Sequence, residues 1–390
     1  MQDTDPSAGA ACAATVSPRS RDAWKIPCLV PDLPSADELL SYLRDIDDNR
    51  WYTNFGPLQC CFETAMAAFV APGRPQVIAA AFSSATLALE LTLRALGLEP
   101  GARVLLPALT FPATLLAVMR AGLTPVLGDV DPATWALDPQ AVEADAAKTR
   151  IDAVLPVAPF GYPVPMAPWV GFRARTGIPV LADTAGALGS QVTDGTLPMV
   201  FSLHATKPLS AGEGGVLVSA DAPLVASARA LSNFGFSNGQ IIAAGTNAKF
   251  SEYHAAVGLA QLARAECVLE KRRQVLAWYR SLLPASLLRP LPAGDDPASC
   301  PAMLPVHTGA RADQVAAQLA RAGIETRRWY YPPLHQHAAF RGVARNATGT
   351  LTVTEALAQG LVGIPFHSHL READIRFVAS HLLAALREAA

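Results

Sequence analysis

The chain has 390 residues, of which 51% are hydrophobic and 16% are charged. This apolar composition excludes an intrinsically disordered chain, and the length suits one large domain plus a smaller one. The formal net charge of -2 leaves no basic excess for binding nucleic acid or a membrane surface. Any anion site must therefore be local, built from a few backbone amides and side chains.

The six cysteines are scattered and form no Cys-x-x-Cys pair. This pattern argues against a disulfide framework or a metal site, and it favours reduced thiols in a cytoplasmic enzyme. The N-terminus has no basic stretch followed by an apolar run, so no signal peptide is expected. The most apolar long segment, residues 154–170, contains five prolines and is not expected to form a membrane helix.

The first elements in chain order are an arm and a helix. Residues 1–22 are rich in Ala, Ser, Asp and Pro and lack apolar periodicity, so they are predicted to form a mobile arm. A helix is predicted to start near Ser35. Leucines at 39, 40 and 43 share one face of it, and Ser35 with Glu38 fits a capping box.

From residue 76 onward, short apolar runs alternate with helical stretches. This alternation predicts an α/β domain with a mainly parallel or mixed sheet, and runs that are apolar at every position suit a sheet covered on both faces. Helices are expected over 86–98 and 112–121. The expected strands are 76–81, 103–107, 125–128, 153–157, 179–182, 199–203 and 215–219.

The C-terminal part has a different pattern. A long helical stretch is predicted over 252–283, followed by a late strand at 360–366 and a closing helix at 370–389. We therefore expect a large domain over 23–270, which includes an N-terminal segment, and a smaller C-terminal α/β domain over 271–390.

Three polar motifs follow predicted strands, at the sheet edge where open α/β proteins bind ligands. Residues 83–86 (Ser-Ser-Ala-Thr) begin a helix whose N–H groups and dipole favour an anion, although ordinary capping uses the same residues. Asp183 is either a partner for a protonated ring nitrogen or a loop carboxylate. Lys207 precedes a Gly-rich turn, where partial burial would lower its pKa; the alternative is a solvated surface lysine.

Together these motifs resemble the DegT/StrS-type sugar aminotransferases, which are fold-type I pyridoxal-phosphate enzymes. Ser-x-His-Ala-Thr-Lys at 202–207, followed by Gly-Glu-Gly-Gly at 212–215, is similar to the family's cofactor-lysine motif. The match is close over about residues 50–270 and looser beyond. Other matching strings occur in the family's order and spacing, at 54–57, 62–63, 85–89, 107–111, 128–131, 183–185 and 245–252.

The resemblance implies roles for residues around the cofactor ring. The seven-stranded-type sheet of this fold would carry Lys207 as the Schiff-base lysine. Asp183 would pair with the pyridine nitrogen and keep it protonated, which makes the ring an electron acceptor. Phe111 would stack on one ring face. Many members have Gln or His three positions after the aspartate, whereas this chain has Gly186, so the ring there must be contacted by another group or be more open.

The resemblance also implies a phosphate site and a substrate site. Thr86 and Ser202, with backbone amides around Ala85, would bind the phosphate. Asn247 matches a residue that reaches the phosphate from the neighbouring subunit, which implies a homodimer with a shared active site. Further candidates for contact with the substrate are Lys249, which stands where many members have Arg, Tyr331 and His335.

The implied activity is a pyridoxal-phosphate-dependent transamination. An amino acid, L-glutamate by family analogy, would donate an amino group to a nucleotide-linked keto sugar, with 4-keto sugars favoured. The amino sugar would serve polysaccharide or secondary-metabolite biosynthesis. Two alternatives remain: a related sugar dehydratase, in which histidine replaces the lysine, and a non-catalytic pyridoxal-phosphate-binding homologue, which need not keep Lys207.

Overall fold

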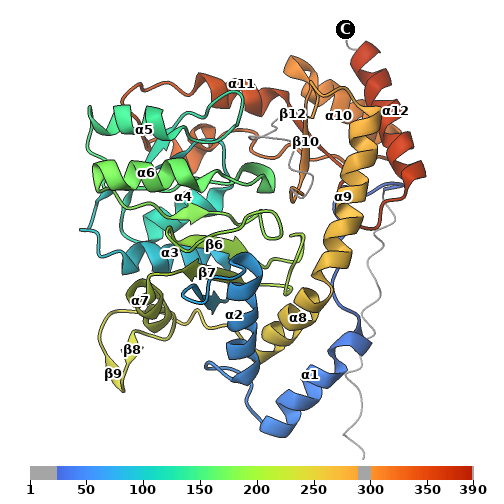
Figure 1. Cartoon of the computed structure of the whole chain (residues 1–390). Coiled ribbons are helices and arrows are strands. Elements are labelled where there is room, and N and C mark those ends of the chain that lie inside the picture. Colours follow the sequence, from blue (N-terminus) through green and yellow to red (C-terminus); the bar gives the residue numbers. More distant parts are fainter. Residues whose placement is uncertain (1–23, 289–299, 389–390) are drawn as a thin grey trace, which may run out of the picture.

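The computed structural model describes residues 24–288 and 300–388, and the predicted arm at residues 1–22 lies outside them. A sheet with helices on both faces makes up most of the molecule, and a smaller group of helices with two paired strands follows in the C-terminal part (Figure 1). Within the described ranges, no helix combines the length and apolar character needed to cross a lipid bilayer.

The central sheet is built from two groups of strands. One group pairs in the order β1-β7-β6-β5, and the other in the order β11-β3-β2-β4. Backbone hydrogen bonds from Val154 N to Pro179 O (3.0 Å) and from Asp183 N to Pro156 O (2.8 Å) join β4 to β5. The strands are β1 (Ile78–Phe82), β2 (Arg103–Pro107), β3 (Thr124–Gly128), β4 (Ala153–Val154), β5 (Ala182–Asp183), β6 (Met199–Ser202), β7 (Gly215–Ser219) and β11 (Ala344–Arg345).

Strand direction confirms the predicted mixed, mainly parallel sheet. β7 runs antiparallel to both of its neighbours, β1 and β6. The pairs β5–β6, β2–β3, β2–β4 and β3–β11 are parallel. The carboxyl ends of β1 to β6 therefore meet along one edge, which is where the polar motifs of the sequence lie.

Helices cover both faces of the sheet. They are α2 (Pro57–Val70), α3 (Ala85–Ala95), α4 (Pro112–Arg120), α5 (Pro139–Ala146), α6 (Met166–Thr176), α7 (Ala222–Ser232) and α8 (Glu252–Ala263). Along β1, Ala80 and Phe82 join the apolar cluster that includes residues of α3, α4 and α7. Ala79 and Ala81 join the cluster that includes residues of α2 and α8. Because successive side chains of a strand point to opposite faces, a strand covered on both sides must be apolar throughout.

The helix boundaries confirm one prediction and correct another. Helix α1 (Ala36–Asn49) begins with the expected capping box, in which the Ser35 N–H donates to Glu38 Oε2 (2.7 Å). The long helical stretch predicted over 252–283 is helical but not continuous, because α8 ends at residue 263 and α9 (Ala265–Leu282) begins anew. Arg264 between them has φ -104° and ψ 7°, and its guanidinium donates to Asp32 Oδ1 (2.9 Å). Apolar periodicity cannot reveal this contact with the N-terminal segment.

The C-terminal part has an apolar core of its own. Ile26, from the N-terminal segment, joins this core and pairs with Ile324. Strands β10 and β12 are antiparallel and lie beside α9, α10 and α12. The bounds of the remaining elements are α10 (Ala312–Arg321), α11 (Thr352–Gly360), α12 (Glu372–Glu388), β8 (Phe236–Ser237), β9 (Gln240–Ile241), β10 (Leu304–His307) and β12 (Leu361–Ile364).

A glycine at the start of β7 controls how closely α3 approaches the sheet. A Cβ atom on Gly215 would lie 2.4 Å from both the Cα and the N of Ala85, the first residue of α3. We expect Gly215→Ala to lower the free energy of unfolding by about 1–3 kcal/mol, the usual cost of overpacking. Urea denaturation measures this change. Gly342→Ala is the control, because its Cβ would meet no atom within 4 Å, and equal stability of the two variants would contradict the prediction.

Candidate active site

A cavity of about 410 Å³ opens at the carboxyl edge of the central sheet. Loops that follow β1, β2, β4, β5 and β6 all contribute to its wall, as the topology of an open α/β sheet requires. Six of the candidate residues from the sequence line this one cavity: Ala85, Thr86, Phe111, Asp183, Ser202 and Lys207.

Four other candidates do not line the cavity: Asn247, Lys249, Tyr331 and His335. His335 is buried, and its Nε2 lies 2.8 Å from Glu355 Oε1. Tyr331 is exposed, and its ring lies 4.4 Å from the guanidinium carbon of Arg328. The Lys249 amine lies 4.6 Å from the centre of the Phe234 ring, and Asn247 is exposed to solvent. In a single chain, these four side chains therefore lie outside the cavity, each among different neighbours.

Lys207 and Asp183 lie at the same cavity from adjacent strands. The lysine follows β6 in a tight loop, where its N–H donates to His204 O (2.9 Å). Burial lowers the pKa of Lys207, although the charge of Asp183 opposes this shift. Asp183 is only 5% exposed, and burial raises the pKa of its carboxyl group. Hydrogen bonds and the nearby lysine act in the opposite direction on that carboxyl. A nucleophilic amine thus lies beside a carboxylate that can hold a cation.

The start of α3 is suited to binding an anion, and we call its residues Ser84, Ala85 and Thr86 the anion seat. The Ser84 side chain caps the helix by accepting from Leu87 N (3.2 Å). The N–H groups of Ala85 and Thr86 come before the first helical donor, Ala88 N, which donates to Ser84 O (3.0 Å), so they are available to a ligand. Ser202 lines the same cavity, and its Oγ accepts from His204 N (3.3 Å). A helix N-terminus with adjacent hydroxyl groups is a favourable site for a phosphate group.

Phe111 presents a large aromatic face at the cavity. It is the residue before α4, and 61% of its surface is exposed. A planar ligand stacked on this ring would cover apolar surface that is now in contact with water. Together, the helix start, the amine, the buried carboxylate and the aromatic face match the phosphate, aldehyde, ring nitrogen and ring plane of pyridoxal phosphate.

Gly186, where the family resemblance leads us to expect a larger side chain, has a close backbone neighbour. A Cβ on Gly186 would lie 3.0 Å from the Cα and N of Gly161. Gly161 has φ 89°, and the preceding Phe160 has φ 55°, so this segment makes an unusual turn toward the cavity. Both residues line the cavity. Another part of the backbone, rather than open space, therefore takes the place of the missing side chain.

Sequence reasoning missed several residues of the cavity wall. Thr110 directly precedes Phe111, and Thr114 comes three residues after it; both line the cavity. Their spacing of four residues at a helix start is a signal that could have identified them. Tyr330 lines the cavity although its neighbour Tyr331 does not, and its ring centre is 4.7 Å from that of Phe160. Leu29, Glu213, Met303 and Trp329 also contribute. Glu213 lies within the Gly-Glu-Gly-Gly string of the lysine motif, whereas the segments around Leu29, Met303 and Trp329 carry no local pattern that points to a ligand.

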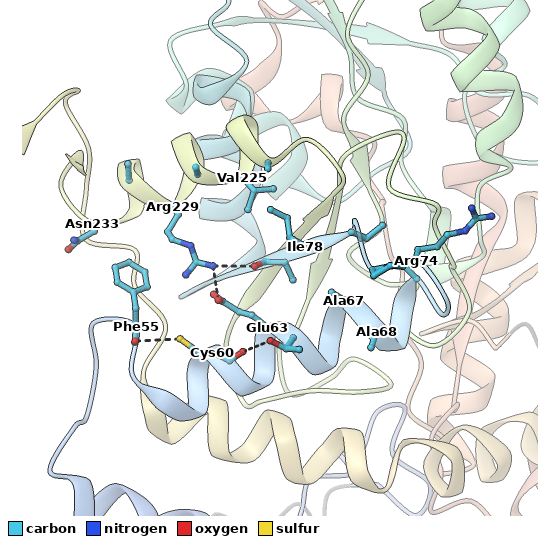
Figure 2. A pocket seen from close by; sticks show the side chains of 18 of the residues that line it. Phe55, Cys60, Glu63, Ala67, Ala68, Arg74, Ile78, Val225, Arg229 and Asn233 are labelled. Atoms are coloured by element: carbon cyan, nitrogen blue, oxygen red, sulfur yellow. Dashed lines mark hydrogen bonds and ion pairs between the residues drawn. The ribbon is translucent and has the colours of Figure 1, made fainter. Parts of the chain in front are cut away.

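A larger groove of about 1060 Å³ lies elsewhere, between α2 and α7 (Figure 2). Arg229 on α7 donates to Glu63 Oε2 on α2 (2.6 Å) and to Ala79 O (3.2 Å), as Figure 2 shows. These contacts tie the two helices together across β1 and leave the charges paired. The groove contains none of the lysine, aspartate or helix-start residues, so the smaller cavity is the candidate active site despite its lesser volume.

Comparison with known proteins agrees with this geometry. The GDP-perosamine synthase of Caulobacter vibrioides is 31% identical over 87% of this chain and 93% of its own. The dTDP-4-amino-4,6-dideoxy-D-glucose transaminase of Escherichia coli is 27% identical over 93% of this chain and 99% of its own. The crystal structure of DesI in the presence of its TDP-sugar product superposes with a TM-score of 0.82 at 35% identity, covering 94% of this chain and 95% of that one.

The match to a protein family spans nearly the whole described chain. Residues 35–383 match the DegT/DnrJ/EryC1/StrS aminotransferase family, and this range contains both the anion seat and the pair formed by Lys207 and Asp183. The chain therefore belongs to the DegT/DnrJ/EryC1/StrS aminotransferase family and is a pyridoxal-phosphate-dependent aminotransferase.

Proposed function

We propose that the protein transfers the amino group of L-glutamate to a nucleotide-linked 4-keto sugar. The observation that carries this proposal is the arrangement of Lys207, Asp183 and the start of α3 around one cavity. The names of the E. coli transaminase and of the DesI complex support a 4-amino sugar and a nucleotide-linked product, respectively. The product would enter the synthesis of a polysaccharide or a secondary metabolite.

Each step assigns a task to residues of this chain. Bound pyridoxal phosphate supplies an aldehyde and an electron-accepting ring. The Lys207 amine, whose pKa burial lowers, would hold the cofactor at its aldehyde carbon and would move a proton at the α-carbon of the donor. Asp183 would keep a proton on the ring nitrogen. The start of α3, with Thr86 and Ser202, would hold the phosphate, and Phe111 would pack against the face of the ring.

Removal of the lysine amine tests the proposed function. We expect Lys207→Ala to lose the visible absorbance of lysine-bound cofactor and to lower turnover by about three orders of magnitude or more. The assay mixes L-glutamate with a panel of nucleotide-linked 4-keto and 3-keto sugars and detects amino sugars by mass spectrometry. Lys271→Ala on α9 is the control, because Lys271 is exposed and lies outside the cavity.

Other outcomes of the same assay identify the alternatives. Glutamate should change the visible spectrum of the wild-type protein if it is a transaminase. Loss of water from the sugar without that change would indicate a dehydratase, and binding of cofactor without any product would indicate a non-catalytic homologue. Normal turnover by Lys207→Ala would exclude the proposed role of the lysine.

We also propose that the protein is a homodimer with shared active sites. Asn247 does not line the cavity of its own chain, so its proposed contact with the phosphate requires a second copy. The nearby β8–β9 hairpin exposes apolar side chains, and residues 230–248 contain no charged side chain. Exposed apolar surface of this kind is typical of interfaces. The exposed residues are Phe234, Phe236, Ile241 and Ile242, each between 44% and 65% exposed.

A charged hairpin should weaken the dimer. We expect the double variant Ile241→Glu, Ile242→Glu to sediment as a monomer at concentrations where the wild type is a dimer, because two desolvated carboxylates oppose association. The same variant should retain pyridoxal phosphate less tightly. Met119→Glu is the control, since Met119 is an exposed apolar residue on α4, away from the hairpin. A monomeric wild type in analytical ultracentrifugation would overturn the proposal.

A further inference from the structure

Two threonine hydroxyl groups connect in series to the buried aspartate. Thr114 Oγ1 lies 2.7 Å from Asp183 Oδ2, and Thr110 Oγ1 lies 2.9 Å from Thr114 Oγ1. Thr110 and Thr114 are each 1% exposed. Because water has little access to these groups, each hydroxyl depends on the other for its hydrogen bonds.

The direction of the hydrogen bonds follows from the chemistry of the groups. An ionised carboxylate can only accept, so the Thr114 hydroxyl must donate its single proton to Asp183. Thr114 can then only accept from Thr110, which makes the Thr110 hydroxyl the donor of that pair. The proton order from Thr110 to Thr114 to Asp183 is therefore fixed while the carboxylate is charged.

The second carboxylate oxygen is held by a different loop. Asp183 Oδ1 accepts from the N–H of Ala185 (3.1 Å), which follows β5, whereas both threonines belong to the connection between β2 and α4. Two separate loops thus fix the plane of one carboxylate. Thr114 also lies in the first turn of α4, and Phe111 is the residue that precedes this helix. One helix start consequently determines the position of both the aromatic face and the carboxylate.

From this geometry we propose that Thr114 and Thr110 are positioning residues for the cofactor: they orient the Asp183 carboxylate toward the ring nitrogen and keep it ionised. The inference rests on the proposed role of Asp183. Hydrogen bonds to a charged acceptor are stronger than neutral ones, and a chain of donors polarises each member in the same direction. The Thr114 hydroxyl opposes the rise in the pKa of Asp183 that burial causes.

Two substitutions distinguish the effect of the Thr114 hydroxyl from the effect of the rest of its side chain. Thr114→Val keeps the shape and removes the hydroxyl, whereas Thr114→Ser keeps the hydroxyl and removes a methyl group. Loss of this donor raises the pKa of the Asp183 carboxyl, so the proton shared with the ring nitrogen moves toward the carboxylate, and an uncharged ring nitrogen no longer repels a proton on the lysine nitrogen. The midpoint of the pH-dependent visible absorbance of the holoenzyme should therefore move upward by about one pH unit in Thr114→Val.

Cofactor retention gives a second measurement that does not depend on turnover. We expect Thr114→Val to bind pyridoxal phosphate about tenfold less tightly, measured by loss of bound-cofactor absorbance on dilution. Thr114→Ser should keep both the midpoint and the affinity close to those of the wild type. Thr110→Val should shift both in the same direction as Thr114→Val but by less, because the direct bond to Asp183 remains.

The outcomes distinguish this inference from the function on which it depends. If Thr114→Val and Thr114→Ser behave alike, the hydroxyl has no positioning role and the inference is overturned. Lys207→Ala is measured in parallel. Loss of the lysine-bound absorbance in that variant, with no change in Thr114→Val, would leave the proposed function standing and reject only the role of the threonines.

Discussion

The pair formed by an amine and a buried carboxylate at one cavity is the constraint on which the site depends. A carboxylate that is 5% exposed is costly unless hydrogen bonds and positive charge compensate for lost hydration. Asp183 receives both kinds of compensation, from Thr114, from the backbone of Ala185 and from the charge of Lys207. The loops after β2, β5 and β6 must therefore keep fixed positions relative to one another, which only a rigid sheet can provide.

The sheet also explains why residues far apart in sequence meet at the cavity. Parallel strands end at the same edge, so the loops that follow them converge whatever their separation along the chain. The strand β7 runs antiparallel and begins at that edge with Gly215, whose missing side chain lets the start of α3 come close. The anion seat follows β1 and the lysine loop follows β6, the two strands that flank β7, so both line the same cavity.

Much of the fold and about half of the site could be predicted from the sequence, for physical reasons. The strands were recognisable because a sheet covered on both faces requires apolar residues at every position, as in β1 and β2. The break at Arg264 was not recognisable, because Arg264 contacts Asp32, more than 200 residues away, and no local pattern shows that contact. Likewise, the resemblance led to Lys207 and Asp183, but choosing between Tyr330 and Tyr331 required the turn that places only the first at the cavity. The roles of these residues remain proposals.

The wall of the cavity includes residues from the N-terminal segment and from the C-terminal part of the described chain. Leu29 contributes from the N-terminal segment, which also pairs with the C-terminal part through Ile26 and Ile324, and Trp329 contributes from beyond the long helices. During synthesis, strands β1 to β7 emerge from the ribosome well before Trp329 does. The enclosure around the lysine can thus close only after the C-terminal part has been made and has docked, so a truncated nascent chain would carry the reactive amine without the compartment that shields it.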